Sequence, residues 1–292
     1  MNPKNIKKRR FKKLFFLIAF LISVTTLFYY SFVFEPNNIQ VEKISIEIEN
    51  LPGGFEGAKI IHLTDFHSRD FGEREKRVLK ITKDLDPDFV FITGDFIDHN
   101  TKDLDSCQKF WRELSNQHQG KVFGVFGNHE HWLQSPDISA IKRMLERNGI
   151  SILNNENKKI YLSSKNEALP RSYIYLIGVD DPDSELDDLP KAMLNTEENI
   201  PKILLAHSPD IIDNLQEEKV DLILVGHTHG GQVVIPFMRP SWVPTKNHGK
   251  YASGLFEVND TYLYVNRGIG MASLQIRFNC PPEITVLELR KK

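Results

Sequence analysis

Runs of hydrophobic and polar positions divide the chain into a long apolar segment near the N-terminus and a mixed body. Residues 39–49 alternate apolar and polar side chains, which is typical of a half-buried strand. Shorter, continuous apolar runs follow, and their length suits strands that are buried on both faces. These runs are 59–63, 88–92, 122–126, 173–177, 202–205, 221–225, 262–265 and 283–289.

Helical periodicity occupies several of the intervals between these runs, at 73–85, 104–115 and 138–148. Strands that alternate with helices indicate a layered α/β domain. The length of 292 residues suits one domain of roughly 250 residues with an additional segment. Residues 165–172 are expected to form an exposed loop.

The additional segment is the apolar run 14–34, which contains no charged residue. About 20 apolar residues in a helix cross the hydrocarbon layer of a bilayer. A cleaved signal peptide is the main alternative, but no small-x-small cleavage site follows the run. Arg9 and Arg10 leave a twin-arginine export signal open as well, although their neighbours fit that motif poorly. The pattern favours an uncleaved transmembrane anchor.

Charge is distributed unevenly along the chain. Residues 1–34 hold seven basic residues and no acidic one, and all seven precede the apolar run. Positive flanks remain in the cytoplasm, so the body is expected outside it, on a single-pass protein of the inner membrane. The predicted organisation is a cytoplasmic tail at 1–13, an anchor at 14–34, a linker and first strand at 35–58, and the globular domain at 59–292.

The composition of the body excludes some partners. The chain has 37 basic and 39 acidic residues. Residues 35–292 contain 30 of the basic residues and all 39 acidic residues, which gives a formal charge of −9. Binding to a nucleic-acid backbone needs a basic face, so no nucleic-acid partner is expected. Cys107 and Cys280 match no metal or redox motif, and we expect two separate thiols.

Five polar clusters stand where predicted strands end. Because the carboxyl ends of strands in an open α/β sheet meet at one crevice, these side chains are expected to converge. The clusters are Asp65-Phe66-His67, Gly94-Asp95-Phe96-Ile97-Asp98, Gly127-Asn128-His129-Glu130, the single His207, and Gly226-His227-Thr228-His229-Gly230.

The residue types in these clusters point to a metal site. Carboxylate, amide and imidazole groups without thiolates suit manganese, iron, zinc or cobalt. In the Asp-x-His and His-x-His sequences, alternate residues of an extended segment face the same side, so each can offer two ligands. The neighbouring glycines allow the backbone to turn sharply beside the metals.

With these motifs in this order, the chain resembles the calcineurin-like metallophosphoesterases over residues 59–289. The resemblance implies a four-layer α/β/β/α sandwich, here with an N-terminal transmembrane helix, and two divalent transition metal ions ~3.5–4 Å apart that activate water for attack on phosphorus. Manganese is the first expectation, with iron or zinc as alternatives. By position, one metal takes Asp65, His67 and His229, the other takes Asn128, His207 and His227, and Asp95 bridges both.

The resemblance also assigns the acid–base residues. His129 is expected to protonate or stabilise the leaving oxygen, and Asp98 to orient the His129 ring. Family members that act on phosphoproteins have an arginine directly after the second aspartate, where this chain has His99. This difference argues against a protein phosphatase.

Residues 226–240, 248–256 and the tail from Asn266 resemble a narrower group, bacterial membrane-anchored phosphodiesterases, and also the UDP-diacylglucosamine pyrophosphatases of lipid A synthesis. The expected activity is therefore hydrolysis of a phosphodiester or pyrophosphate, in a membrane lipid or another envelope molecule. Lys250, Arg267 and Arg277 are candidates for contacting phosphate. A binding scaffold without catalysis and a nucleotidase are the alternatives.

Overall fold

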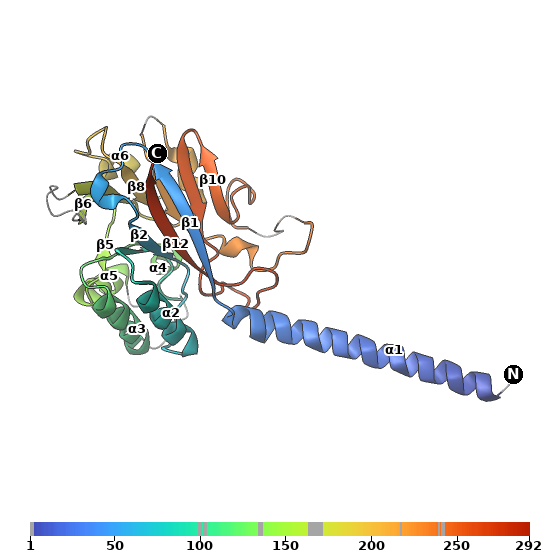
Figure 1. Ribbon diagram of the computed structural model, residues 1–292. Helices are drawn as coiled ribbons and strands as arrows, with labels where there is room; N and C mark the ends of the chain where they lie inside the picture. Colours follow the sequence, from blue (N-terminus) through green and yellow to red (C-terminus); the bar gives the residue numbers. More distant parts are fainter. Residues whose placement is uncertain are drawn as a thin grey trace.

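The computed structural model describes residues 3–98, 101, 104–133, 137–162, 172–216, 218–238, 240 and 243–292. The loop expected at 165–172 lies outside these ranges except for Ser172. Figure 1 shows a body from which one long helix, α1 (Pro3–Tyr29), projects. A π-helical turn, η1 (Tyr30–Phe34), and a 3₁₀ turn, η2 (Glu35–Asn37), join α1 to the body.

The body contains two six-stranded sheets. The first has the order β1 (Gln40–Ile48), β12 (Glu283–Lys291), β2 (Lys59–Leu63), β3 (Phe89–Thr93), β4 (Val122–Val125) and β5 (Ser151–Ile152). The second has the order β10 (Gly254–Val258), β11 (Thr261–Val265), β9 (Leu222–Val225), β8 (Lys202–Leu205), β7 (Ser172–Gly178) and β6 (Glu156–Leu162). Both sheets mix parallel and antiparallel pairs.

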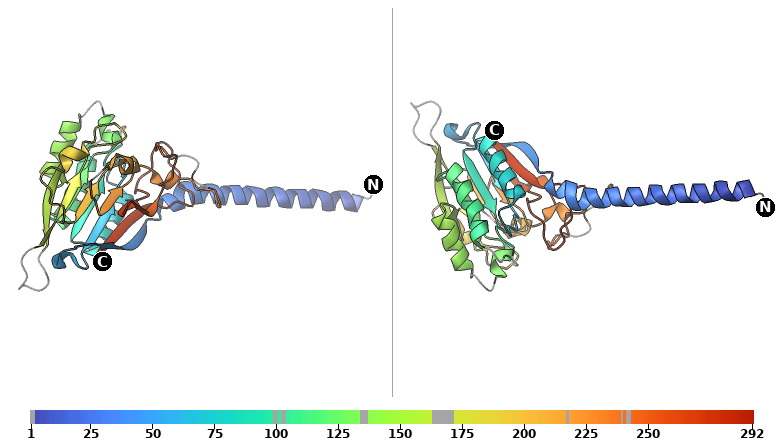
Figure 2. Two further views of the ribbon diagram at one scale, coloured as in Figure 1. Left: turned by 90° about the horizontal axis from the view of Figure 1, so that it is seen from above. Right: turned by 90° about the horizontal axis from the view of Figure 1, so that it is seen from below.

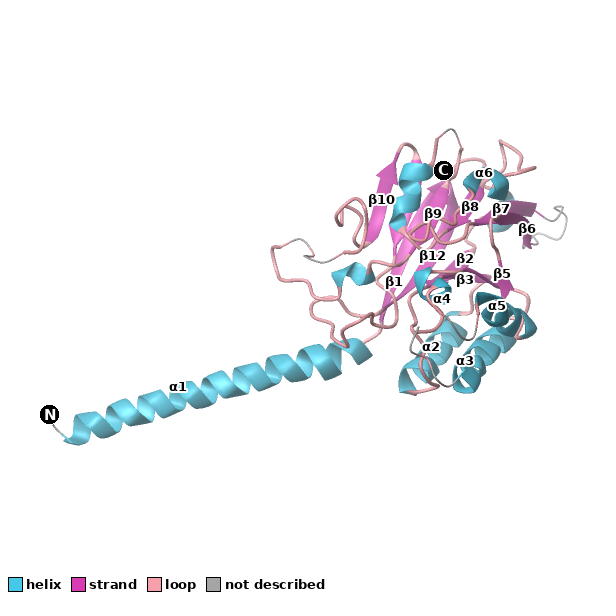
Figure 3. Ribbon diagram, turned by 180° about the vertical axis from the view of Figure 1, so that it is seen from behind, coloured by secondary structure: helices cyan, strands magenta, loops and turns pink. Residues whose placement is uncertain are grey.

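The sheets pack face to face, with helices on their outer faces (Figures 1 and 3). Ile60, Phe91 and Leu287 of the first sheet meet Leu176 and Leu224 of the second in one apolar cluster. Helices α2 (Glu73–Leu85), α3 (Leu104–Gln117) and α5 (Ile138–Arg147) cover the first sheet. The thinner layer on the second sheet comes from α6 (Leu189–Ala192) and the 3₁₀ helix η4 (Pro209–Asn214). The predicted sandwich is therefore confirmed.

The elements that the sequence did not predict lie mainly at sheet edges. β5 has two residues, and β6 alternates exposed charges with half-buried positions, so neither forms an apolar run. β10 pairs with β11 through a tight turn in which Asn259 and Asp260 both have positive φ. An Asn-Asp pair in such a turn is a hairpin signal that apolar runs alone do not reveal.

The first strand belongs to the sandwich and does not merely lead to it. All nine residues of β1 pair in parallel with β12, and β12 pairs antiparallel with β2. The C-terminal strand thus lies between β1 and β2, which ties the segment that follows the anchor into the first sheet.

Candidate dinuclear metal centre

The five polar clusters converge because their strands point the same way. In the first sheet β2, β3 and β4 are parallel, and in the second β8 and β9 are parallel. The loops after these strands meet at one end of the sandwich, where all seven predicted metal ligands are buried. These ligands are Asp65, His67, Asp95, Asn128, His207, His227 and His229.

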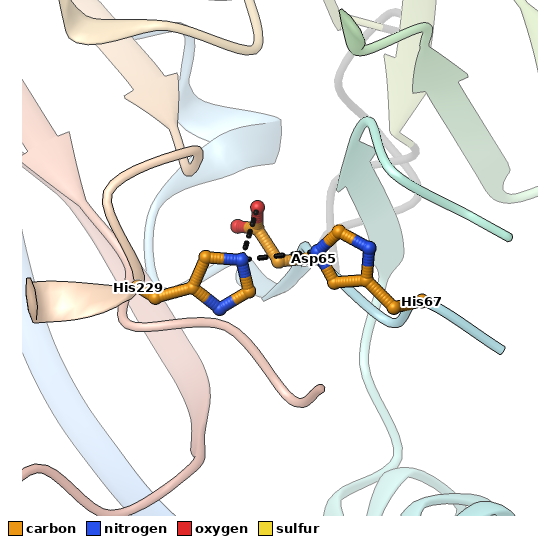
Figure 4. A group of neighbouring side chains, drawn as sticks. All are labelled: Asp65, His67 and His229. Atoms are coloured by element: carbon orange, nitrogen blue, oxygen red, sulfur yellow. Dashed lines mark hydrogen bonds and ion pairs between the residues drawn. The ribbon is translucent and has the colours of Figure 1, made fainter. Parts of the chain in front are cut away.

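Asp65, His67 and His229 form one compact group, although His229 lies 162 residues beyond His67 (Figure 4). The Nε2 atoms of the two imidazoles are 3.0 Å apart, and His229 Nε2 lies 3.4 Å from Asp65 Oδ1. Two nitrogen ligands at ~2.1 Å from one ion and at right angles to each other would be about 3.0 Å apart. The spacing therefore fits a shared metal.

Asn128, His207 and His227 supply a second set of inward-facing atoms. His227 Nε2 donates to the carbonyl of Pro244 at 2.7 Å, and its Nδ1 lies 3.1 Å from Asn128 Oδ1. His207 Nδ1 donates to the carbonyl of Thr93 at 2.7 Å, and its buried Nε2 has no hydrogen-bond partner. Such outer hydrogen bonds fix the tautomer of a histidine that binds metal through its other nitrogen.

Asp95 lies between the two sets. Its Oδ2 is 3.4 Å from His67 Nε2 and 3.4 Å from His207 Nε2, which belong to different sets. Its Oδ1 accepts the backbone N–H of His129 at 3.1 Å. One carboxylate within reach of both sets, and oxygen and imidazole donors throughout, are consistent with a dinuclear metal site.

The backbone at the site is held in an uncommon conformation. Asp65, His67, Asp95, His227 and His229 all have φ between 44° and 69°. Left-handed backbone is unfavourable for residues that carry a Cβ, and it persists where surrounding contacts enforce it for function. Five of the seven predicted ligands share this feature, which the sequence pattern did not reveal.

Two glycines allow the loops to approach this closely. Gly94 has φ of 89°, and a Cβ there would lie 2.5 Å from His207 Nδ1 and 2.7 Å from the backbone nitrogen of Gly127. A Cβ at Gly226 would collide with the side chains of Thr64 and Asp65. Any larger residue at either position would push the two sheets' loops apart.

Burial prepares the first histidine pair for metal. Desolvation lowers the pKa of His67 to about 3, against the opposing charge of Asp95, and lowers the pKa of His229 well below its usual range, with Arg277 adding to the effect. Both imidazoles are therefore neutral near pH 7. Neutral imidazole is the form that binds a metal, so no proton has to leave these two ligands.

The pair His207 and Asp95 behaves differently. Burial opposes both charges, but their mutual attraction prevails, so the pKa of Asp95 is held well below its usual value and that of His207 well above. Without a metal, a proton on His207 neutralises Asp95. A cation bound there would replace that proton, so metal binding at this position is coupled to proton release.

Glu130 supports the site without belonging to the predicted ligand set. Its carboxylate accepts the backbone N–H groups of Asp95 at 3.0 Å, Gly127 at 3.0 Å and Ile97 at 3.2 Å. Burial, followed by repulsion from Asp95, raises the pKa of Glu130 to about 8. The sequence contained this residue within the Gly-Asn-His-Glu motif, but nothing in its spacing indicated that it would hold the loops after β3 and β4 together.

The predicted acid–base residues His129 and Asp98 lie in the loops after β4 and β3, which also carry metal ligands. The His129 ring packs edge-on against His67, with centroids 4.4 Å apart, and also contacts Trp132 at 4.7 Å. Asp98 is buried and forms a salt bridge with Arg69 Nη2 at 2.7 Å. Arg69, two residues beyond His67, is thus a further charged residue at the site that the sequence analysis did not single out.

A cavity of about 220 Å³ opens beside the metal ligands. The metal-facing part of its wall contains Asp95, Asn128, His129, His227 and His229. The rest of its lining contains Trp132, Asp183, Thr228, Gly231, Gln232, Pro244, Ala272 and Ser273. A phosphate group in this cavity would contact the metal ligands and His129 together.

The three cations predicted as phosphate contacts have other roles or positions. Arg277 is fully buried and donates to the carbonyls of Gly268, Gly270 and Cys280, so its expected contact with phosphate is wrong. Arg267 is engaged by Glu283 at 2.6 Å and Glu42 at 2.7 Å. Lys250 is exposed over the ring of Tyr251.

Several other residues around the site can also be placed. His62 is buried in β2 and bonds Thr93 Oγ1 at 2.8 Å. His131 pairs with Asp180 at 2.7 Å. The two cysteines are separate buried thiols, as predicted. His99 lies outside the described residues.

The comparisons with known proteins agree with this site. The model of the family "Calcineurin-like phosphoesterase" matches residues 58–231. The chain therefore belongs to the calcineurin-like metallophosphoesterases and is a metal-dependent phosphoester hydrolase.

Several relatives share most of its length. The uncharacterized metallophosphoesterase YkuE of Bacillus subtilis is 31% identical over 98% of this chain and 99% of its own. Phosphodiesterase YaeI of Escherichia coli is 30% identical over 79% and 82%. A transmembrane protein with metallophosphoesterase domain from Danio rerio is 28% identical over 93% and 62%. Among solved structures, the phosphoesterase YfkN of Bacillus subtilis has a TM-score of 0.42 at 16% identity, covering 73% of this chain and 81% of that one.

Proposed function

We propose that this chain is a membrane-anchored hydrolase that cleaves a phosphodiester or pyrophosphate bond in a lipid or cell-envelope molecule. The observation that supports the proposal is the cavity, whose lining includes His129 and members of both ligand sets. A relative of similar length, YaeI, is named a phosphodiesterase. The absence of an arginine directly after Asp98 in the sequence speaks against a protein phosphatase.

The ligand assignment follows from the two sets. Asp65, His67 and His229 hold one ion, and Asn128, His207 and His227 hold the other. Asp95 is shared, because one of its oxygens is equally distant from His67 and His207. Two divalent ions, with manganese favoured and iron or zinc as alternatives, supply charge neutralisation of the phosphate and a nucleophilic water at neutral pH.

His129 and Asp98 carry the proton transfer. His129 faces the cavity and is in a position to donate a proton to the leaving oxygen. Asp98, fixed by Arg69, stabilises the charged form of the His129 ring and sets its orientation. Arg69 acts as a positioning residue in this arrangement, through the carboxylate that it holds.

The anchor is α1 with its continuation to Asn37. The most apolar 18-residue window of the helical segment Arg9–Asn37 has a mean hydropathy of 2.0, and only 6% of that window is buried against the body, so it is not a core helix. A signal sequence passes the same test of length and composition. We favour the uncleaved anchor, with residues 1–13 in the cytoplasm, 14–34 in the bilayer and the body outside, because the basic residues all precede the apolar run. The similar fish protein is named a transmembrane protein.

The decisive experiment measures metal-dependent cleavage of bis-p-nitrophenyl phosphate by the full chain in detergent, after chelation and readdition of manganese. We expect activity to return with two metal equivalents. A chain that binds two metals but cleaves no phosphodiester or pyrophosphate would instead be a binding scaffold. Extracted membrane lipids and UDP-linked lipids then serve as the substrate panel.

A further inference from the structure

Two loops beside the end of the anchor expose large apolar side chains. One follows η5 (His229–Gly231) and carries Ile235, Phe237 and Met238, which are 49%, 108% and 58% exposed. The other precedes β12 and carries Leu274, 68% exposed. We call these four residues the apolar rim. Clustered apolar surface of this kind on a protein marks a site of contact with a partner or membrane.

The two loops form one unit. The backbone N–H of Phe278 donates to the carbonyl of Gln232 at 2.8 Å, and that of Val234 donates to Phe278 at 2.9 Å. The Gln232 side chain also accepts the N–H of Ala272 at 2.8 Å and donates to the carbonyl of Leu274 at 3.3 Å. The apolar rim therefore belongs to two loops that hydrogen bonds join to each other.

The same unit is fastened to the end of the anchor. The backbone N–H of Arg277 donates to the carbonyl of Ser31 at 3.0 Å, and Phe278 contacts the ring of Tyr30 edge-on at 6.0 Å. The carboxylate of Glu35 accepts the backbone N–H groups of Asn279 and Cys280. The position of the rim relative to α1 is thus held by three hydrogen bonds, one to Ser31 and two to Glu35, and by the ring contact at Tyr30.

The direction of the first loop matches that of the anchor. In Figure 1 the orange segment between η5 and β10 extends from the body on the side from which α1 leaves it. In Figure 2, which views the molecule from above and from below, the same segment overlaps the end of α1 nearest the body. A bilayer that contains α1 would therefore meet this loop at its surface.

The bases of these loops line the cavity. Gly231 and Gln232 of the first loop, and Ala272 and Ser273 of the second, form its wall next to the metal ligands. Each loop thus has its base at the metal centre and its tip at the apolar rim.

We infer that the apolar rim inserts into the interfacial layer of the bilayer that holds α1, and that the cavity consequently takes phosphodiesters or pyrophosphates whose acyl chains stay in the membrane. The inference rests on the proposed function for its substrate class, and on the proposed anchor for the position of the bilayer. Apolar side chains that continue the exposed surface of the anchor are favoured in that layer over water. A soluble phosphoester needs no such rim.

The first test reads the rim directly and requires no turnover. Single substitutions Phe237→Cys and Leu274→Cys are labelled with an environment-sensitive fluorophore in the full chain, reconstituted in nanodiscs of phosphatidylethanolamine and phosphatidylglycerol. Cys107 and Cys280 are buried, and the unsubstituted chain supplies the labelling blank. Leu194→Cys, 62% exposed just after α6, is the matched control.

We expect a blue-shifted emission at the two rim positions and quenching by lipids with a nitroxide on the upper acyl chain, with neither effect at position 194. Equal, water-like emission at all three positions would overturn the inference. It would leave the phosphoesterase proposal intact, because the labelled chains can be assayed on bis-p-nitrophenyl phosphate.

The second test compares cleavage of a soluble phosphodiester with cleavage of a phosphodiester embedded in a bilayer. The double variant Phe237→Ser and Leu274→Ser is assayed on soluble bis-p-nitrophenyl phosphate and on a dioleoylglycerol p-nitrophenyl phosphodiester embedded in the same nanodiscs. We expect the soluble activity to stay within about twofold, and the embedded one to fall roughly tenfold, because less apolar area holds the cavity at the interface. An unchanged ratio of the two rates contradicts the substrate inference. Absence of both activities in the unsubstituted chain contradicts the proposed function.

Discussion

The carboxylate of Glu130 accepts the backbone N–H of Asp95 at 3.0 Å, so the residue that the sequence predicts as shared between two metals is held from behind by a buried acid. The same acid binds Gly127 and Ile97. Glu130 thus links the loops after β3 and β4. All three of these hydrogen bonds come from backbone N–H groups. Glu130 is a positioning residue.

Replacing Glu130 by Gln should weaken this support while keeping the shape. One oxygen becomes an N–H₂ group that cannot accept a backbone N–H, so at least one of the three donors loses its partner. Changes just outside a ligand shell typically cost ~10–100-fold in metal affinity, and we expect that range in a competition titration against a chelator. Glu146→Gln, on the exposed face of α5, is the control and should leave the affinity unchanged. A normal affinity for Glu130→Gln would assign the residue to folding alone.

Asp95→Asn should affect both metals, whereas Asp65→Asn should affect one. An amide carries no charge and binds a cation more weakly, and Asp95 faces both ligand sets. Elemental analysis of chain equilibrated at limiting manganese should give two ions for the unsubstituted protein, one for Asp65→Asn and fewer than one for Asp95→Asn. A single ion in the unsubstituted protein at saturation would refute the dinuclear assignment.

His129→Ala should slow turnover by roughly 10²–10⁴-fold without removing metal, the usual range for acid–base help. The loss should shrink for substrates with good leaving groups, which depart without a proton. The measurement is kcat for aryl phosphodiesters of graded leaving-group pKa, with exposed His248→Ala as control. Equal losses across the series would argue against proton donation. Asp98→Asn and Arg69→Ala should show weaker versions of the same dependence.

The stability of the fold should fall in acid partly through His62. Burial lowers its pKa from 6.5 to about 3, so between these values the unfolded chain binds a proton that the folded chain does not. The free energy of unfolding therefore decreases as pH falls through this window, by up to about 1.4 kcal/mol per pH unit for one such group. His62→Gln should reduce this slope in urea unfolding of chelator-treated protein in mild detergent. The exposed His248→Gln should not change it, and an unaltered slope for His62→Gln would contradict the buried neutral imidazole.

Reporter fusions at the C-terminus of the full chain test the orientation. With the basic residues inside, alkaline phosphatase should be active and green fluorescent protein dark. The opposite result would place the body in the cytoplasm, and would favour a pyrophosphatase acting on UDP-linked lipid precursors over the general phosphodiesterase. A mature chain shortened to the body would show that the apolar helix is a cleaved signal sequence.

The sequence by itself determined the strands that carry the site, because buried strands are continuous apolar runs and each ended in a polar motif. The runs at 59–63 and 202–205 coincide with β2 and β8, and the motifs after them supplied Asp65, His67 and His207. It also determined the apolar anchor, whose composition is a local property. Edge elements such as β6 were missed, because half of their positions face water.

Only the tertiary structure decided which side chains act together. Arg277 and Glu130 are both charged residues in motif regions. Arg277 donates hydrogen bonds to backbone carbonyls of its own loop, whereas Glu130 accepts hydrogen bonds from backbone N–H groups of the ligand loops. The left-handed backbone of the ligands is held by the loops that surround it, and the union of the rim loops with Ser31 and Glu35 depends on contacts between segments more than 200 residues apart. Local patterns report how a segment is buried. They contain no information about which distant segment covers it.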